Sequence, residues 1–190
     1  MSLFDAILGR SRPIKASIDQ MFALSTAELT METEFGLSPQ GGAAICFKPV
    51  SSGDFARMEA DINDLLKASS SSDAPLQSHT FRDTYGYQWI ILQTPDFSNL
   101  VATVHMINRE LQDHGYSEQL LASVFQFADT NGRHVYWIYN YKRATFYPFV
   151  PGPNQSRDNA LELRLSSIME RELPVERDLT KWYALWGIPL

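Results

Sequence analysis

The four histidines are the natural place to look for chemistry, because a neutral imidazole can bind a metal or carry a proton near neutral pH. They are His79, His105, His114 and His134. None are spaced as the His-x₃-His pair of a helical metal site, and His-Glu-x-x-His does not occur. The best local pair is His105 with Arg109, four residues along an expected helix, and a solvated polar face is the favoured explanation. The sequence therefore predicts no metal site.

A nucleophile in a recognisable catalytic setting is also missing. The chain has no Gly-x-Ser-x-Gly motif, and Gly41-Gly42 precedes an expected strand without the Lys-Ser/Thr of a phosphate loop. Cys46 is the only cysteine, so an intramolecular disulfide is excluded, which fits a reducing cytoplasm. It lies within the apolar pattern AAICF, which favours a buried, unreactive thiol. We therefore expect a non-enzymatic protein without a cofactor.

Residues 139–163, YNYKRATFYPFVPGPNQSRDNALEL, combine aromatic side chains with the adjacent cations Lys142 and Arg143. Alternate residues of 134–141 face opposite sides of an extended chain, and aromatic residues occur on both sides. A central strand covered on both faces is the favoured interpretation. The alternative is a partly exposed aromatic platform on which a base or a peptide could stack.

A ligand pocket beside this hairpin is a further hypothesis. Arg143 or Arg157 could hold a carboxylate or phosphate through paired hydrogen bonds, with aromatic side chains as walls. The residues proposed for this pocket are Tyr139, Arg143, Tyr147, Arg157 and His105. Nucleic-acid binding through YKRATFYPF is a third hypothesis, which the net charge of −6 disfavours.

Hydrophobic periodicity assigns the elements of the first half. It predicts a helix over 14–24, half-buried strands over 27–37 and 43–50, and a helix that Ser51 or Ser52 caps. Residues 79–95 read as two strands joined by a turn at Tyr85-Gly86. A helix then starts at Asp96 or Ser98 and ends at Gly115.

In the second half, residues 116–127 read as a further helical piece and Asn131-Gly132 as a turn. Two strands follow over 134–142 and 144–150, and Pro148 places the second at a sheet edge. Asp158 is predicted to cap a last helix that Pro174 ends.

These elements predict an α+β fold, in which an antiparallel sheet of about six strands, built from hairpins, carries helices as a second layer. A chain of 190 residues that is 44% hydrophobic fits a single domain over 1–190. Residues 68–75 are expected to be a flexible Ser-rich surface loop, and residues 1–13 a peripheral segment. The apolar end KWYALWGIPL is predicted to pack on the domain or to mediate a homodimer.

The N-terminal segment is not a convincing signal peptide, because its apolar stretch is short and its cations follow that stretch. Weak contact with an anionic membrane is one hypothesis for it, and protein docking or packing on the chain itself are the alternatives. The residues concerned are Leu3, Phe4, Ile7, Leu8, Arg10 and Arg12, with Lys15 behind them. No apolar run approaches the roughly 20 residues that span a bilayer.

Segments from end to end resemble the phage-shock-protein-A-associated family PspAB. They are LFDAILGRSRP, FKPV, TYGYQW, LQDHGYSEQLL, YKRATFYPF, RDNALEL and LPVERDLTKWYALWG, of which YKRATFYPF with RDNALEL is the most specific. The resemblance implies a bacterial or archaeal cytoplasmic protein in an envelope-stress setting, whose gene neighbours those of PspA or the membrane zinc protease HtpX. It implies no catalytic residues.

The leading functional hypothesis is a non-enzymatic adaptor or regulator in that stress system, with a PspA-like or HtpX-like protein as partner. Its expected location is the cytoplasm, or the inner face of the membrane if the N-terminal segment makes contact there. The alternative is a small-ligand-binding module, or an unrecognised enzyme, with a pocket near residues 135–149.

Overall fold

The computed structural model describes residues 18–48, 51–69 and 75–190. The N-terminal residues considered for membrane contact, Leu3 to Arg12 and Lys15, therefore lie outside the described residues, as do residues 70–74 of the expected Ser-rich loop. The elements, in chain order, are η2 (Ile18–Phe22), α2 (Ala23–Phe35), β1 (Ser38–Phe47), α3 (Ser52–Ser69), β2 (Gln77–Arg82), β3 (Gln88–Gln93), α4 (Phe97–Asp113), β4 (Leu120–Ala128), β5 (His134–Asn140), β6 (Thr145–Phe149), η3 (Pro153–Gln155), α5 (Asn159–Met169) and η4 (Leu179–Lys181).

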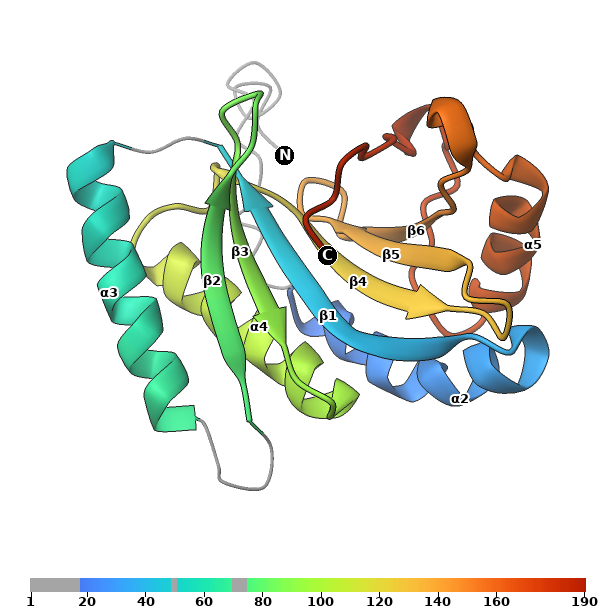
Figure 1. Ribbon diagram of the computed structural model, residues 1–190, viewed down its shortest axis with the longest axis horizontal. Coiled ribbons are helices and arrows are strands. Elements are labelled where there is room, and N and C mark those ends of the chain that lie inside the picture. Colours follow the sequence, from blue (N-terminus) through green and yellow to red (C-terminus); the bar gives the residue numbers. More distant parts are fainter. Residues whose placement is uncertain (1–17, 49–50, 70–74) are drawn as a thin grey trace, which may run out of the picture.

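Six strands form one antiparallel sheet in the order β2-β3-β1-β4-β5-β6 (Figure 1). Two parts of it are built from consecutive strands, the hairpin β2–β3 and the meander β4–β5–β6. The long strand β1 lies between them. The predicted α+β fold with an antiparallel six-stranded sheet is thus confirmed, and Pro148 lies in the edge strand β6, as predicted.

An irregularity bends β1 near its start. The register with β4 shifts between Pro39 and Ala43, and Gly41 there has a φ of 71°. A Cβ on Gly41 would lie 2.8 Å from the Thr94 carbonyl oxygen, so both the backbone conformation and the space require glycine. The bend lets β1 follow the curvature of the sheet between its two halves.

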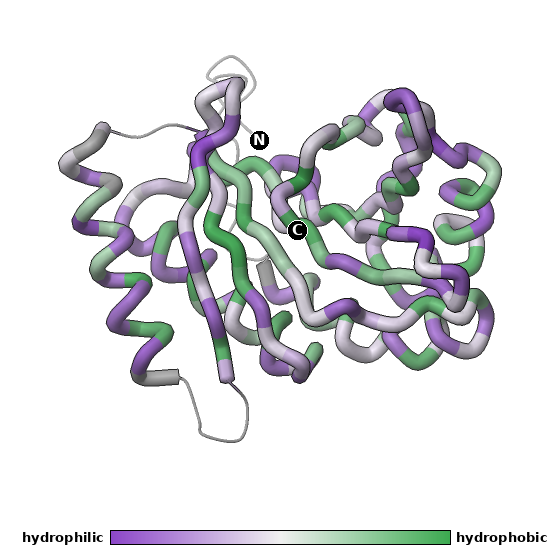
Figure 2. Tube along the Cα trace, in the orientation of Figure 1, coloured by the Kyte–Doolittle hydropathy of each residue, from purple (hydrophilic) through white to green (hydrophobic). Residues whose placement is uncertain are grey.

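Helices α2, α3, α4 and α5 cover one face of the sheet and share one apolar core with it. Asp96 caps α4 by accepting a hydrogen bond from Asn99 N at 3.0 Å, and Asp158 caps α5 in the same way from Leu161 N. Figure 2 shows the hydrophobic colour running along the inner strands, whereas the edge strand β2 is mostly hydrophilic. Residues of this core include Leu24, Met31, Ile62, Leu100, Ile107, Trp137, Tyr139, Leu165 and Met169.

Among the described residues, the opposite face of the sheet is covered by the C-terminal part of the chain and by no α-helix. We call residues 174–190 the C-terminal strap; they carry the short helix η4 and otherwise run as irregular chain (red in Figure 1). The strap packs Trp182, Leu185, Trp186, Ile188 and Leu190 against strand residues that point away from the helices. Those strand residues are Ala44, Cys46, Trp89, Ile91, Val124, Tyr136, Ile138, Tyr147 and Phe149. The strand β5 is therefore covered on both faces, which was the favoured interpretation of its aromatic pattern.

Three sequence-based assignments are wrong. Residues 27–37, predicted as a strand, mostly belong to α2, because the buried residues Leu24, Ala27 and Met31 recur at helical spacing while Leu29 is 68% exposed. Residues 116–127, predicted as helical, lead into β4, a central strand buried on both faces that shows no simple alternation. The expected loop 68–75 is wrong in its first two residues, because α3 continues through Ser69.

Candidate functional site

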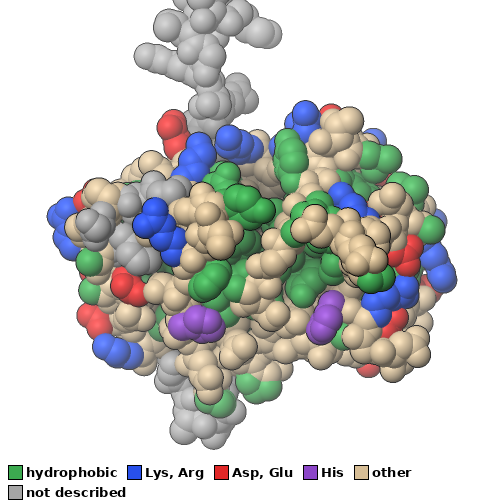
Figure 3. Space-filling model, turned by 45° about the horizontal axis from the view of Figure 1, so that its top comes forward, with side chains coloured by type: hydrophobic (Ala, Val, Ile, Leu, Met, Phe, Trp, Pro, Cys, Tyr) green, Lys and Arg blue, Asp and Glu red, His purple; other side chains and the backbone are tan. Residues whose placement is uncertain are grey.

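A cavity of about 660 Å³ lies on the face of the sheet that carries the strap. The β2–β3 hairpin forms one wall, the strap and the β5–β6 turn form the other, and residues of β1, β3 and β4 form the floor. Figure 3 shows hydrophobic side chains gathering in the hollow on this side of the molecule, with Lys and Arg side chains near its edge. The lining residues are Cys46, Asp83, Tyr85, Tyr87, Trp89, Leu121, Ala122, Asn140, Lys142, Arg143, Tyr147, Lys181, Tyr183, Ala184, Leu185 and Trp186.

Aromatic side chains dominate the two walls. Tyr85 is 82% exposed, and Tyr87 and Tyr183 are 40% and 53% exposed, which is unusual for side chains of this size. Trp89 is buried at the floor, and Trp186 of the strap packs edge-on against Phe149 with ring centroids 5.1 Å apart. The cavity thus has an apolar floor with Trp89 in it and a rim of accessible tyrosines.

Asp83 organises the hairpin wall. Its carboxylate accepts hydrogen bonds from the backbone N–H groups of Tyr85 and Tyr87, both at 2.9 Å, and from Trp89 Nε1 at 3.0 Å. An aspartate that accepts from backbone groups two and four residues later fixes a tight turn. Asp83 therefore sets the positions of three aromatic side chains of the cavity at once.

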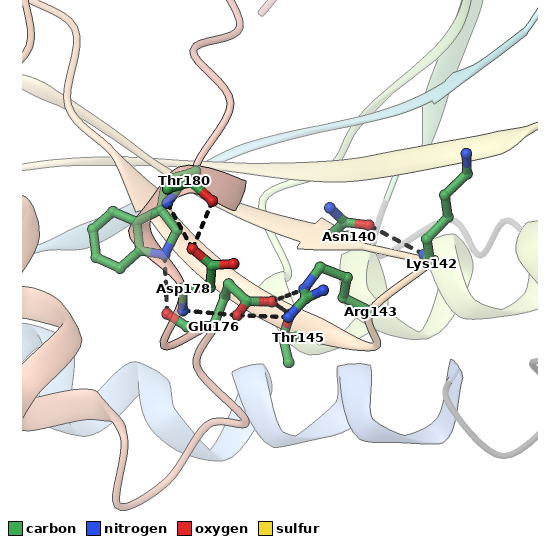
Figure 4. A network of polar contacts seen from close by, with 8 residues as sticks. Asn140, Lys142, Arg143, Thr145, Glu176, Asp178 and Thr180 are labelled. Carbon is green, nitrogen blue, oxygen red and sulfur yellow. Dashed lines mark hydrogen bonds and ion pairs between the residues drawn. The ribbon is translucent and has the colours of Figure 1, made fainter.

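The opposite wall is fixed by a polar network around Glu176 (Figure 4). The Glu176 carboxylate accepts from Arg143 Nε and Nη2, from Thr145 Oγ1 at 3.1 Å and from Asp178 N at 2.9 Å. The hydrogen bonds from Arg143 are the main cause that lowers the pKa of Glu176 below its ordinary value, although burial acts in the opposite direction. Because Glu176 belongs to the strap and Arg143 to the β5–β6 turn, this pair fastens the strap to the sheet.

Two further hydrogen bonds, from Tyr147 and Arg157, hold the strap to the domain, and a third, from Trp182, lies within the strap. Tyr147 Oη donates to the Tyr183 carbonyl oxygen at 3.1 Å, and Trp182 Nε1 donates to the Glu176 carbonyl oxygen at 2.9 Å. Arg157 Nη1 donates to the Trp182 carbonyl oxygen at 2.7 Å. Burial raises the pKa of Tyr147, so its hydroxyl remains protonated and can donate at all physiological pH values. The wall of the cavity formed by the strap is thus a preformed structure.

Two lysines at the cavity form no salt bridge within the described part of the chain, although Asp178 attracts Lys181 electrostatically. Lys142 is exposed in the β5–β6 turn, and Figure 4 shows its side chain directed away from Arg143 and Glu176. Lys181 is half-buried at the end of η4. The cavity lining therefore contains the cations Lys142, Arg143 and Lys181 against the single carboxylate of Asp83.

Cys46 lies at the floor of the cavity, 5% exposed. Burial raises the pKa of its thiol to about 12, so the thiolate is not populated near neutral pH. This agrees with the predicted buried, unreactive thiol.

The five residues proposed from the sequence for one pocket are separated by the fold. Arg143 and Tyr147 line the cavity. Tyr139 points to the other face of β5 and is fully buried in the helix-side core. Arg157 pairs with the buried Glu162 at 3.0 Å and borders a smaller cavity of about 290 Å³ between α5 and the strap.

His105 is farther away, on the helical side of the sheet. It is 8% exposed, its Nε2 lies 2.9 Å from Asp19 Oδ1, and its ring contacts Phe22 with centroids 4.5 Å apart. The expected solvated face for this histidine is wrong, because η2 covers that part of α4. Among the described residues, no group of three or more His, Cys, Asp or Glu side chains is placed to hold a metal ion.

Sequence reasoning missed the hairpin wall and the strap wall of the cavity. Asp83, Tyr85 and Tyr87 stand in a recognisable turn sequence, DTYGY, which predicts the turn but not what it faces. Tyr183 and Trp186 stand out in the sequence only as part of an apolar end. These strap residues lie opposite the hairpin because β1 is placed between β3 and β4, and no local sequence pattern encodes that placement.

The lining of the cavity is suited to binding. Its apolar floor, accessible tyrosine rim and lysines without a salt bridge suit a bulky apolar group that is accompanied by negative charge. The buried nucleophilic atom of its lining, the Cys46 sulfur, is protonated at neutral pH.

Comparison with models of known protein families gives a match over the whole given sequence. The sequence model of a family described as PspAB, PspA associated protein B, matches residues 1–190. No curated protein and no solved structure matches the chain. Over the residues that the structure describes, no helix is both long enough and apolar enough to cross a bilayer.

Proposed function

The chain belongs to the PspA associated protein B family, and we propose that it is a non-catalytic adaptor that binds a protein of the PspA system through the cavity beside the strap. The observation that carries the proposal is the ring of accessible aromatic side chains, Tyr85, Tyr87 and Tyr183, around a rigid apolar hollow. Tyrosine and tryptophan are enriched at the centres of protein interfaces, where a few such residues supply most of the binding free energy.

PspA itself is the first partner to test, because the family takes its name from an association with it. An HtpX-like protease is the second, from the resemblance described above. We place the adaptor in the cytoplasm, where a reduced Cys46 is expected, and at the inner face of the membrane if residues 1–13 make contact there.

A calorimetric titration of the purified chain with PspA from the same organism tests the proposal. We expect saturable binding by the wild type, and at least a tenfold weaker affinity for the double variant Tyr85→Ser, Tyr183→Ser, since two aromatic contacts are lost. Leu29→Ser is the matched control, because Leu29 is an equally exposed apolar residue on the helical side. The absence of wild-type binding to PspA would refute this partner, and unchanged affinity of the tyrosine variant would refute the role of the cavity.

A small-ligand-binding module is the second candidate function. The cavity volume of about 660 Å³ favours it, because it lies within the range of roughly 300–1,000 Å³ that is typical of ligand pockets. Native mass spectrometry of the protein purified from its own host distinguishes the two candidates. A bound small molecule that the double tyrosine variant lacks would favour the module over the adaptor.

A further inference from the structure

The cavity is electrically asymmetric, and this asymmetry bears on what can enter it. Its cations all lie on the wall formed by the β5–β6 turn and the strap, namely Lys142, Arg143 and Lys181. Its single carboxylate, Asp83, lies on the hairpin wall, and its oxygens already accept three hydrogen bonds from that hairpin. One side of the cavity therefore carries the cations, while the other carries the negative charge of Asp83, whose oxygens are already occupied by hydrogen bonds from the hairpin.

The positive charge on this wall is only partly balanced by the protein. Arg143 is paired with Glu176, which removes most of its attraction for a ligand. Within the described residues, Lys142 and Lys181 have no carboxylate in contact. Asp178, the acidic residue nearest to Lys181 in the sequence, accepts from Thr180 N at 3.0 Å and Thr180 Oγ1 at 2.6 Å. Its charge also attracts Lys181, so Lys142 is the less compensated of the two lysines.

This local excess of cations stands on a chain whose net charge is −6. Two lysines without a salt bridge, Lys142 and Lys181, flank an apolar hollow on an otherwise acidic protein and favour an acidic partner, because charge complementarity both steers and selects association. A basic partner would be attracted by the net negative charge of the rest of the protein but not by this site.

The apolar part of the cavity defines the other half of the ligand. Its floor contains Trp89 and Cys46, and Leu185 and Trp186 of the strap close one side. Burial of a bulky apolar side chain against such a surface adds a hydrophobic contribution to the binding free energy that a purely ionic ligand could not gain. The fit is thus to one large apolar side chain with carboxylates beside it.

We infer that the cavity binds an acidic segment of a partner protein, which inserts a bulky apolar side chain between the β2–β3 hairpin and the strap and places carboxylates on Lys142 and Lys181. This inference rests on the proposed adaptor function and specifies the chemistry of the segment that the adaptor takes. It involves no covalent step.

Fluorescence anisotropy with the full chain and three fluorescein-labelled peptides tests the inference. The first peptide has one tryptophan between two pairs of glutamates, the second has lysines in place of the glutamates, and the third has serine in place of the tryptophan. We expect the first peptide to bind at least tenfold more tightly than either of the others. Comparable binding of the lysine peptide would overturn the inference.

The double variant Lys142→Glu, Lys181→Glu supplies the matching test on the protein. We expect it to lose at least tenfold in affinity for the first peptide, while the control Lys67→Glu, on α3 and away from the cavity, keeps wild-type affinity. Unchanged affinity of the double variant would overturn the inference. Thermal melts of both variants verify that they fold as the wild type does.

Vesicle binding and PspA binding by the double lysine variant distinguish an acidic protein segment from a membrane surface as the occupant of the cavity. If phosphatidylglycerol vesicles bind the wild type but not the double lysine variant, and the acidic peptide does not bind, the site serves a membrane surface and the inference fails. If PspA binds the double lysine variant as tightly as the wild type, the inference fails while the proposed function stands. If the acidic peptide binds through the lysines and PspA does not bind, the inference holds and the assignment of PspA as partner fails.

Discussion

At the scale of single residues, Glu176 connects the strap to the sheet. Its carboxylate accepts hydrogen bonds from the side chains of Arg143 and Thr145 and from the Asp178 N–H. Its backbone carbonyl accepts a hydrogen bond from the Trp182 indole. A buried carboxylate with this many donors is stabilised in its charged form, as the lowered pKa indicates. The charge on Glu176 therefore contributes to stability.

We predict that Glu176→Gln lowers the free energy of unfolding by about 1–2 kcal/mol at pH 7, because a neutral amide is a weaker acceptor for Arg143. The folded pKa of Glu176 lies below its unfolded value of about 4.5, so this contribution is complete above that value. It is lost as the pH falls through the lower folded pKa. Urea denaturation of both proteins between pH 7 and pH 3 measures the difference.

The control for this experiment is Glu170→Gln, an exposed glutamate on the connection that leads to the strap. Its free energy of unfolding should follow that of the wild type at every pH. A Glu176→Gln penalty that persists unchanged at pH 3 would show that shape, and not charge, explains the role of Glu176.

Individual site residues differed in how far the sequence revealed them. Arg143 and Tyr147 were predicted because cations and aromatics occur together in one hairpin, and both line the cavity. Tyr139 was assigned to the same pocket, but strand alternation places it on the helix-side face of the sheet. Ile138 and its cross-strand neighbour Tyr147 lie on the other face. The sequence around Asp83 gives no indication of a role in a site. That role follows only from the three N–H groups that donate to its carboxylate.

At the scale of elements, the strap is a structural part of the domain. Trp182 is 7% exposed and stacks on Tyr147 with ring centroids 6.3 Å apart, and the apolar residues after it cover the sheet. Without this cover, a row of apolar strand residues would face water. The strap thus does for one face what the helices do for the other.

We predict that Trp182→Ala lowers the free energy of unfolding by about 3 kcal/mol, the order expected when a large buried aromatic side chain is removed. Truncation after Leu179 should destabilise the domain more strongly and increase the binding of an apolar dye. Tyr183→Ser is the control, since Tyr183 is 53% exposed and its backbone carbonyl, which accepts from Tyr147, is retained. A truncated chain with the wild-type melting temperature would contradict the structural role of the strap.

The elements that sequence reasoning identified best were those with local signals. The caps Asp96 and Asp158 and the hairpin β2–β3 all depend on neighbouring residues. The strand β4 was missed because burial on both faces removes the alternation on which strand recognition depends. In α2, Leu29, Met31 and Thr33 alternate with polar residues, a pattern that is also typical of a strand. The packing of Met31 in the shared core decides between strand and helix.

At the scale of the whole molecule, the net negative charge and the burial of the β5 aromatic side chains together predict poor nucleic-acid binding. The net charge is −6, and the aromatic residues of β5 are buried on both faces, so no stack of bases can form on that strand. We expect no retardation of a single-stranded oligonucleotide in a gel at low salt. A retarded band that disappears when salt is added would contradict this expectation.

The position of the strap in the sequence also has a consequence for biosynthesis. Residues 174–190 follow all six strands, so a ribosome completes the sheet before it makes the cover for one face. During that interval the helices can already protect one side, whereas Ile91, Val124 and Ile138 on the other side stay open to water. Nascent chains that stall before the strap emerges would therefore present a continuous apolar strand surface, the kind of surface that chaperones bind and that aggregates.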